Sequence, residues 1–438
     1  MTHSRALPPI DTMQHHTMRR SLYIYIIMTL LCLTGLQGQP TQKGYRIKVK
    51  TTMPCEKVFL YGYDGSQRLC MDSARMKKGS ALFKSKADIP CGVYTLSSQS
   101  GGRPVDIILN HDNKIAVTIN GQTVSIEGSE ESQLLNQFQA LPGREWPQQS
   151  QEMAQSMPQS FVGKYIMANY GVSIDNVTTT LEKMLALCEV TDFTEPRLLH
   201  SPVRTLLWAD KPIRDEEITS TEEILDYLNT LLHRPMSPII QNHLIDKLFQ
   251  ALDVHNPDYD PALIYLYDKF DKSWIEEGRE GRYKRKIDNL RKIVPGAQIP
   301  ELISHDKDGK AHSTNEIKNK YTVLWFWDPD CDHCQEMTPV LHKMYQEHAD
   351  AWDFEVFAVE VNDDHDRWVA FSDQHHLWDW TNLSTSMGDQ NLDFIEYFDI
   401  MTTPVVFLID NSKEHTIIAR QITLDELEHF FEKNQEKK

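Results

Sequence analysis

The chain has 438 residues, with 40% hydrophobic and 25% charged side chains, a composition typical of soluble globular proteins and a length that allows several domains. Its formal net charge is −18, because 63 acidic residues outnumber 45 lysines and arginines. This balance argues against a nucleic-acid partner, since nucleic acids are bound by basic surfaces.

Residues 1–38 have the pattern of a leader with a secretory signal peptide. Arg19 and Arg20 precede an uncharged apolar run, residues 22–34, and small residues follow it up to Gly38. The run is shorter than the roughly 20 apolar residues of a membrane-spanning helix, so we expect cleavage after Gly38 rather than an anchor. An exported chain meets an oxidising compartment, in which disulfide chemistry is common.

Residues 39–128 are predicted to form a small antiparallel, β-sandwich-like domain. Apolar and polar residues alternate over short stretches bounded by turn residues, at 45–50, 57–61, 93–96, 105–109, 115–119 and 124–126. The last two stretches flank Asn120-Gly121, a dipeptide that favours a tight hairpin turn. No catalytic combination of side chains stands out in this segment, so we expect it to serve binding or packing.

Residues 129–293 change to a helical period and are predicted to form a helical domain. Ser220 and Glu223 have the spacing of a capping box ahead of the apolar residues of one helix. Pro238 and Pro261 stand where two further helices would begin, a position at which proline costs no hydrogen bond. Another helix is expected at 274–292, with its basic residues on a solvated face.

Residues 294–438 alternate between buried strands and helices, which is typical of a βαβ unit on a covered sheet. A continuous apolar strand at 321–327 precedes a helix at 332–348 and a second strand at 354–361. Further helices and strands follow, with strands at 404–409 and 416–419 and a last helix at 423–432. The predicted fold class is therefore multidomain: an N-terminal antiparallel β domain, a helical middle region and a C-terminal α/β domain.

Cys331 and Cys334 form a close cysteine pair, with two residues between them. A closed zinc site needs four nitrogen or sulfur ligands, and the downstream His342 and His348 lie too near Cys334 for the usual spacing, so no metal is expected. Redox chemistry needs only local geometry. Cys331 falls where a strand gives way to a helix, whose N-terminus favours a thiolate, and a protonated His333 would add to this effect. Cys334, one turn further on, could then attack a mixed disulfide on Cys331.

The residues around this pair resemble the thioredoxin family. Pro339 stands eight residues after the first cysteine, where that family has a proline in its active-site helix. Thr403-Pro404, ahead of an apolar strand, matches the family's cis-proline that faces the cysteines. The likeness covers 294–438 and is closest to exported, TlpA-like thiol–disulfide oxidoreductases. The whole layout is similar to multidomain envelope thioredoxins, which implies a location in the periplasm or cell envelope of a Gram-negative bacterium.

The resemblance implies roles for the cysteines and for the residues between and around them. Cys331 would be the attacking thiol and Cys334 the resolving thiol, without a cofactor. His333 precedes the second cysteine, as in disulfide isomerases and oxidants, so reduction and isomerisation both stay open. The implied substrates are proteins with disulfides or thiols, served by a membrane or periplasmic redox partner.

The resemblance also implies a substrate-binding rim. Pro404, in cis, would hold its loop so that the backbone of Thr403 pairs with an extended substrate segment. Trp327 and Pro329 would shape the rim around the exposed sulfur.

Two positions depart from the family pattern. Trp325 stands where thioredoxin has a buried aspartate, and Met337 stands where some envelope reductases have a glutamate. Glu360, on the next predicted strand, is a candidate substitute for that acid, although a solvated or capped glutamate is the favoured interpretation.

Two other functions compete with thiol–disulfide exchange. A peroxide-reducing enzyme would carry Thr or Ser three residues before Cys331, where this chain has Asp328. From a different class, an envelope binding or scaffold protein could carry a redox-inactive thioredoxin-like module. Four further cysteines could form disulfides or remain buried thiols, and the sequence leaves this open: Cys55, Cys70, Cys91 and Cys188.

Overall fold

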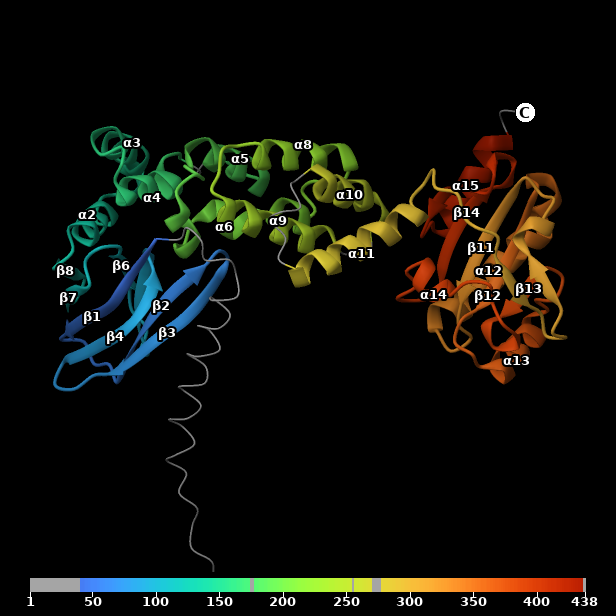
Figure 1. The fold of residues 1–438 in the computed structure, drawn as a ribbon, viewed down its shortest axis with the longest axis horizontal. Coiled ribbons are helices and arrows are strands. Elements are labelled where there is room, and N and C mark those ends of the chain that lie inside the picture. Colours follow the sequence, from blue (N-terminus) through green and yellow to red (C-terminus); the bar gives the residue numbers. More distant parts are fainter. Residues whose placement is uncertain (1–39, 174–176, 254–255, 270–276, 436–438) are drawn as a thin grey trace, which may run out of the picture. The chain divides into compact units, whose positions relative to one another are not determined.

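The computed structural model describes residues 40–173, 177–253, 256–269 and 277–435. The predicted signal peptide and the start of the helix predicted at 274–292 lie outside these ranges. The chain divides into two compact units, one with the described residues up to Ala251 and Glu277, and one with the described residues of 252–269 and 278–435. Along the chain, strands are followed by helices and then by an α/β domain, as the fold class predicts (Figure 1). The domain boundaries at 128 and 293 stay predictions.

The first unit begins with two four-stranded sheets whose buried side chains share one hydrophobic core. One sheet has the order β4-β1-β7-β8 and the other β3-β2-β5-β6. β1 pairs antiparallel with β4 but parallel with β7, so the otherwise antiparallel sandwich contains one parallel pair. The strands are β1 Thr41–Thr51, β2 Lys57–Asp64, β3 Gln67–Arg75, β4 Ser80–Pro90, β5 Gly92–Ser98, β6 Val105–Leu109, β7 Lys114–Asn120 and β8 Thr123–Glu127.

Helices follow the sandwich, and the predicted capping box is confirmed at one of them. The Ser220 hydroxyl accepts from the Glu223 N–H at 3.3 Å, while the Glu223 carboxylate accepts from the Ser220 N–H at 3.3 Å, which satisfies two donors at the start of α8. The helices are α2 Glu130–Gln139, α3 Trp146–Ser156, α4 Phe161–Tyr170, α5 Thr180–Val190, α6 Arg204–Trp208, α7 Lys211–Arg214, α8 Thr221–Leu232 and α9 Pro238–Leu252.

The helical segments also form hydrogen bonds with the edge strand β6 and with the β2–β3 hairpin of the sandwich. Ser132 of α2 bonds the backbone of the edge strand β6, accepting from the Ile108 N–H at 2.9 Å. At the tip of the β2–β3 hairpin, the Gly65 N–H donates to the Leu199 carbonyl at 2.7 Å, and His200 Nδ1 lies 3.1 Å from the Tyr63 carbonyl oxygen. The sandwich and the helical segment 196–200 are therefore joined by a backbone–backbone hydrogen bond and by a contact of the His200 side chain with the backbone.

The second unit is built on a seven-stranded sheet with the order β10-β9-β13-β12-β11-β14-β15. The interior strand β11 runs parallel to β12 and antiparallel to β14. The strands are β9 Ile303–His305, β10 Ala311–Ser313, β11 Tyr321–Trp327, β12 Phe354–Glu360, β13 Thr381–Ser384, β14 Val405–Asp410 and β15 Thr416–Arg420. The helices are α10 Asp260–Lys269, α11 Glu277–Ile293, α12 Asp332–Trp352, α13 His365–His375, α14 Phe394–Tyr397 and α15 Leu424–Gln435.

All seven residues of β11 are buried, which explains its continuous apolar run. Trp325 and Trp327 belong to the same core cluster as Leu341 of α12 and Phe431 of α15. Phe326, the residue between the two tryptophans, instead lies 4.9 Å, centroid to centroid, from the ring of Phe398. Both faces of the strand are therefore covered by side chains.

A buried ion pair ties α10 to the sheet of the second unit. Arg420 Nε, at the end of β15, donates to Asp260 Oδ2 at 2.6 Å, and both side chains are 4% exposed. Burial raises the pKa of Asp260 to about 6, although the Arg420 guanidinium opposes this shift.

Candidate active site

The cysteine pair and the Thr403-Pro404 dipeptide meet at one edge of the second sheet. Cys331 is the residue directly before α12, four positions after the end of β11. Because β14 runs antiparallel to β11, with Val405 opposite Phe326, the start of β14 lies beside the end of β11. The Cys331 thiol accordingly donates to the Thr403 carbonyl at 3.2 Å, across 72 positions of sequence. The Thr403–Pro404 peptide bond is cis, as the resemblance predicts.

The two sulfurs lie in different environments. Partial burial alone would raise the pKa of Cys331, but hydrogen bonds from the Cys334 backbone N–H, the Thr403 side chain, the Cys334 thiol and the His333 backbone N–H lower it below its ordinary value. Cys334 is fully buried, and this burial raises its pKa to about 12. Cys331 therefore ionises more readily than an ordinary cysteine, whereas Cys334 retains its proton at neutral pH.

Cys331 has hydrogen-bond partners in both protonation states, and Thr403 contributes to both, through its carbonyl and through its side chain. As a thiol it donates to the Thr403 carbonyl, which can only accept. As a thiolate it accepts from N–H groups of the first turn of α12, where the helix dipole also favours negative charge. The site thus offers a partner to this sulfur before and after it loses its proton.

His333 stands at the second position of α12, and its side chain is exposed. Its backbone N–H is among the groups that lower the pKa of Cys331. Any contribution from its imidazole is screened by water.

The approach to Cys331 is a turn held by polar groups. The Asp328 carboxylate accepts from the Asp330 N–H at 2.8 Å, and the Gln335 side chain donates to the Pro329 carbonyl at 2.8 Å. Arg367, at the start of α13, forms an ion pair with Asp330. Nothing in the spacing of the sequence pointed to Arg367, whereas Asp-Pro-Asp is a recognisable turn signal.

Trp327 and Pro329, which the resemblance places around the exposed sulfur, are both buried residues. Trp327 is 0% exposed and packs on Phe371, with 5.4 Å between ring centroids, and Pro329 is also buried. Trp327 is the last residue of a strand covered on both faces, so its ring points into the core rather than toward solvent. Thr403 and Pro404 keep partial exposure.

The positions at which the family carries an acid are filled by other groups here. Trp325 is fully buried, and its Nε1 donates to the Thr338 hydroxyl at 3.2 Å, so Thr338 is a supporting residue that the sequence did not single out. Met337 is partly buried against the same core.

Glu360 is buried, so of the two favoured interpretations, a solvated or a capped glutamate, the solvated one is wrong, whereas its carboxylate does accept a backbone N–H. Burial raises its pKa, although the Ser384 hydroxyl and the Asn362 N–H each donate to its carboxylate at 2.6 Å. It pairs in register with Trp327 at the end of β12.

The remaining cysteines are thiols in the described part of the chain. Cys91 and Cys188 are buried, Cys55 is partly exposed and Cys70 is exposed. No disulfide joins any of the six described cysteines.

A parallel βαβ unit with a cysteine pair at the start of its helix, beside a cis-proline from an antiparallel strand, defines a thioredoxin fold. The sequence profile of a thioredoxin-like family matches residues 319–415, and a domain of unknown function (DUF4369) matches residues 45–135. The chain belongs to the thioredoxin superfamily, within which its C-terminal domain is TlpA-like.

Individual relatives carry related descriptions. A thioredoxin-like protein of Haemophilus influenzae is 24% identical over 136 residues, which are 29% of this chain and 71% of that protein. A domain of a possible thiol-disulfide isomerase from Cytophaga hutchinsonii is 30% identical over 33% of this chain and 98% of its own, with a TM-score of 0.30. The thioredoxin domain of a thiol-disulfide oxidoreductase from Bacteroides vulgatus is 26% identical over 32% of this chain and 98% of its own, with a TM-score of 0.29. This chain is thus related to the thiol–disulfide oxidoreductases.

Proposed function

We propose that the protein is an exported thiol–disulfide oxidoreductase that uses Cys331 and Cys334 to reduce or isomerise disulfides of proteins in the cell envelope. The observation that carries this proposal is the asymmetry of the two sulfurs, one partly exposed with a lowered pKa and one buried with a raised pKa. Exchange between disulfides and thiols requires such an exposed nucleophile and a protected second thiol.

The reduction proceeds in two displacements. The Cys331 thiolate attacks one sulfur of a substrate disulfide, forming a mixed disulfide and releasing the other substrate sulfur as a thiolate, which takes a proton from water. Cys334 then loses its proton to solvent and attacks Cys331, which releases the second substrate sulfur. The substrate gains two electrons, and the Cys331–Cys334 pair becomes a disulfide.

Isomerisation uses the same first step with a different ending. If another substrate thiolate attacks the mixed disulfide before Cys334 does, the substrate is released with a new pairing and Cys331 is restored without net oxidation. The raised pKa of Cys334 supports this route, because a protonated resolving thiol leaves the mixed disulfide in place for longer.

The residues beside the sulfurs have proposed supporting roles. Thr403 and Pro404, partly exposed next to Cys331, would bind an extended substrate segment, and His333 would tune the reactivity of Cys331. After net reduction of a substrate, a membrane or periplasmic redox partner must return two electrons to the pair.

Export is supported by the pattern at residues 19–38, which lies outside the described residues. No helix in the described ranges has both the length and the hydrophobicity to span a bilayer.

Reduction of insulin disulfides by the full chain tests the proposal. With dithiothreitol as electron source, the wild type should accelerate insulin precipitation, and Cys331→Ser should abolish the acceleration. Cys334→Ser should trap mixed disulfides that appear as covalent adducts on non-reducing gels. Equal behaviour of wild type and both variants would instead favour a binding or scaffold protein with an inactive module.

The reduction potential of the Cys331–Cys334 pair decides whether the protein reduces, isomerises or oxidises disulfides of its substrates. A value near about −270 mV would indicate a reductase, and one between about −180 and −120 mV would indicate isomerase or oxidant work.

A further inference from the structure

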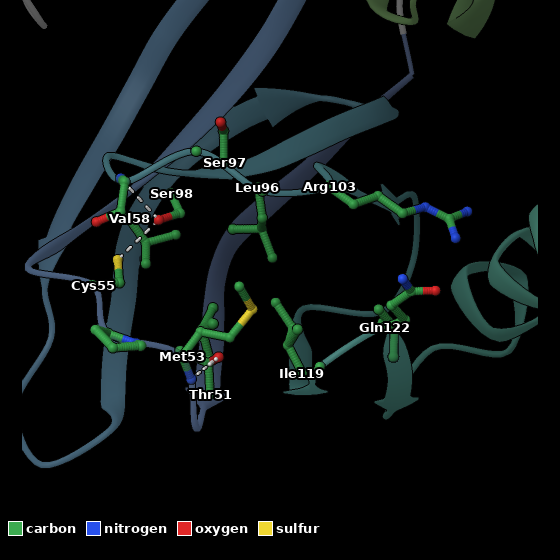
Figure 2. A pocket seen from close by; sticks show the side chains of 17 residues that line it. Thr51, Met53, Cys55, Val58, Leu96, Ser97, Ser98, Arg103, Ile119 and Gln122 are labelled. Atoms are coloured by element: carbon green, nitrogen blue, oxygen red, sulfur yellow. Dashed lines mark hydrogen bonds between the residues drawn. The ribbon is translucent and has the colours of Figure 1, made fainter.

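A cavity of about 650 Å³ opens into the β-sandwich between its two sheets (Figure 2). Its walls come from the ends of β1, β5 and β7, from the beginnings of β2 and β8, and from neighbouring loops. Sites for small molecules have volumes of roughly 300–1,000 Å³, so this space has the size of a ligand site. It belongs to the first unit and is independent of the redox chemistry proposed above.

The cavity exists because the inward-facing side chains around it are aliphatic and of modest size. Five strands each contribute one: Val49 of β1, Val58 of β2, Leu96 of β5, Ile119 of β7 and Val124 of β8. Elsewhere the same core contains the buried rings of Tyr45, Phe83 and Tyr94. Protein interiors leave few spaces larger than a water molecule, because the atoms that line a space lose dispersion contacts.

The wall presents an apolar surface. Figure 2 shows Leu96, Ile119 and Met53 converging on the centre of the cavity. Met53 is 48% exposed, and its unbranched, adaptable side chain is suited to cover apolar groups of different shapes. These three side chains favour the hydrocarbon part of a ligand.

Three polar side chains along the wall, Thr51, Cys55 and Ser98, already have hydrogen-bond partners within the protein. The Thr51 hydroxyl accepts from the Met53 N–H at 3.1 Å. The Ser98 hydroxyl donates to Cys55 Sγ at 3.2 Å, and the Cys55 thiol donates to the Lys57 carbonyl at 3.1 Å. A ligand does not need to supply hydrogen bonds at these positions.

The residues that line the cavity carry a single formal charge. That charge belongs to Arg103, and no lining residue is a carboxylate, although the whole chain has a net charge of −18. Figure 2 shows Arg103 and Gln122 extending outward from the apolar centre. Arg103 Nη2 donates to the Gln139 carbonyl at 3.2 Å, and the guanidinium has further N–H groups to offer an anion.

We propose that this cavity binds an anionic amphiphile, a small molecule with a hydrocarbon chain and one negatively charged head group. The chain would lie among Leu96, Ile119 and Met53, and the head group would pair with Arg103 at the rim. Carboxylate and phosphate head groups share the required chemistry, and the test below separates them.

Calorimetric titration of the full chain with three ten-carbon amphiphiles tests this proposal. Sodium decanoate and decyl phosphate should bind, whereas decyltrimethylammonium should not, and the tighter of the two anions identifies the preferred head group. Binding of all three with equal affinity, or of none, would overturn the proposal.

Two substitutions locate the binding. Arg103→Gln should weaken decanoate binding about tenfold, as loss of a charge-assisted contact predicts. Arg68→Gln is a matched control, since Arg68 stacks on the Tyr61 ring and does not line the cavity, and it should bind decanoate as the wild type does. Leu96→Trp should fill the space and abolish binding. A bulky residue can also disturb the core, so the result with Arg103→Gln decides the outcome. If Arg103→Gln binds decanoate as tightly as the wild type does, the proposal is contradicted.

Two thiols in this domain provide an independent readout. Cys55 lines the cavity and Cys70 is exposed on β3 outside it. Decanoate should slow alkylation of Cys55 by N-ethylmaleimide and leave the rate at Cys70 unchanged. Equal rates at Cys55 with and without decanoate would place the ligand elsewhere and reject the site.

Discussion

Cys331 and Cys334 share one helix turn but differ in exposure, partners and the direction of their pKa shifts. The difference follows from position, because Cys331 precedes the first helical residue, whereas Cys334 points into the core cluster that includes Trp325. Helix N-termini stabilise thiolates, and apolar burial suppresses them. The pKa values of the two cysteines in this motif are thus shifted in opposite directions.

Alkylation should reveal this difference directly. In the reduced full chain at pH 7, iodoacetamide should label Cys331, because its lowered pKa leaves more thiolate than an ordinary cysteine, whose pKa is about 8.5. Cys334 should react only at strongly alkaline pH, in line with its pKa of about 12. Mass spectrometry of Cys331→Ser and Cys334→Ser isolates each thiol. A Cys334 that reacts at pH 7 as fast as Cys331 would contradict the assignment.

Single residues of the site were predictable only where a motif fixed them. The spacing of Cys331, Cys334 and Pro339, together with Thr403-Pro404, was sufficient because it depends on local sequence and on one strand pairing. The burial of the Trp327 ring could not be predicted, since a strand buried on both faces gives no alternation from which the direction of a side chain can be inferred. The burial of Glu360 likewise depends on β13, which supplies Ser384 and which the sequence did not predict.

Among the elements, several alternating strands and the capped helix α8 were predicted, and others were missed, including β4, although buried and exposed residues alternate along it. β3 was missed because none of its residues is buried, so its sequence has no alternation of apolar and polar residues that would predict a strand. β9, β10 and β13 have only three or four residues each and are held by neighbouring strands rather than by local preference. Helix α8, by contrast, carries its own signal in Ser220 and Glu223.

The hairpin between β2 and β3 makes a contact that depends on glycine. Gly65 has φ +56°, and a Cβ there would lie 2.0 Å from Cε1 of His243. Gly65→Ala should therefore destabilise the first unit by roughly 2 kcal/mol or more, combining backbone strain with a clash. Gly121→Ala is the matched control, because Gly121 has φ +60° but open space around it, and should cost only about 1 kcal/mol. Urea unfolding of the full chain measures both, and equal losses would refute the contact.

Two histidines at the same junction should make the first unit sensitive to acid. Burial lowers the pKa of both His200 and His243 from 6.5, with Asp64 opposing the shift at each and Lys247 adding to it at His243. The unfolded chain therefore takes up protons near pH 6.5, while the folded chain does not until lower pH. The stabilisation is complete above about pH 6.5 and declines as the pH falls below that value.

Urea midpoints at pH 5.5, 6.5 and 7.5 test this pH dependence. The first unit of the wild type should be least stable at pH 5.5. A double variant, His200→Gln with His243→Gln, should show a flatter profile over the same interval. A profile that is equally steep in both proteins would assign the effect to other groups.

At the scale of the whole molecule, the chain combines two units with separate chemistry. The redox pair lies in the second unit and the sandwich cavity in the first. The second unit extends beyond the α/β sheet, because α10 is joined to β15 by the Asp260–Arg420 pair. The sequence could not reveal this pair, since 160 residues separate its members and neither belongs to a motif.

Breaking that pair should destabilise the second unit strongly. Arg420→Met leaves the Asp260 carboxylate buried without its partner, which should cost about 3–5 kcal/mol. The double variant Asp260→Leu/Arg420→Met should recover most of this loss, because no isolated charge remains. Urea unfolding of the full chain, followed by tryptophan fluorescence, provides the measurement. A single variant as stable as the wild type would show that the pair contributes nothing.

The antiparallel arrangement of β11 and β14 has a practical consequence for experiments on this molecule. β14 starts at the edge that carries both sulfurs, so the turn at 411–413, directly after it, lies at the other edge of the sheet. A fluorescent dye or an immobilisation tether attached at this turn would leave the reactive face free, and the protein could be fixed to a support with its thiols directed toward the solution.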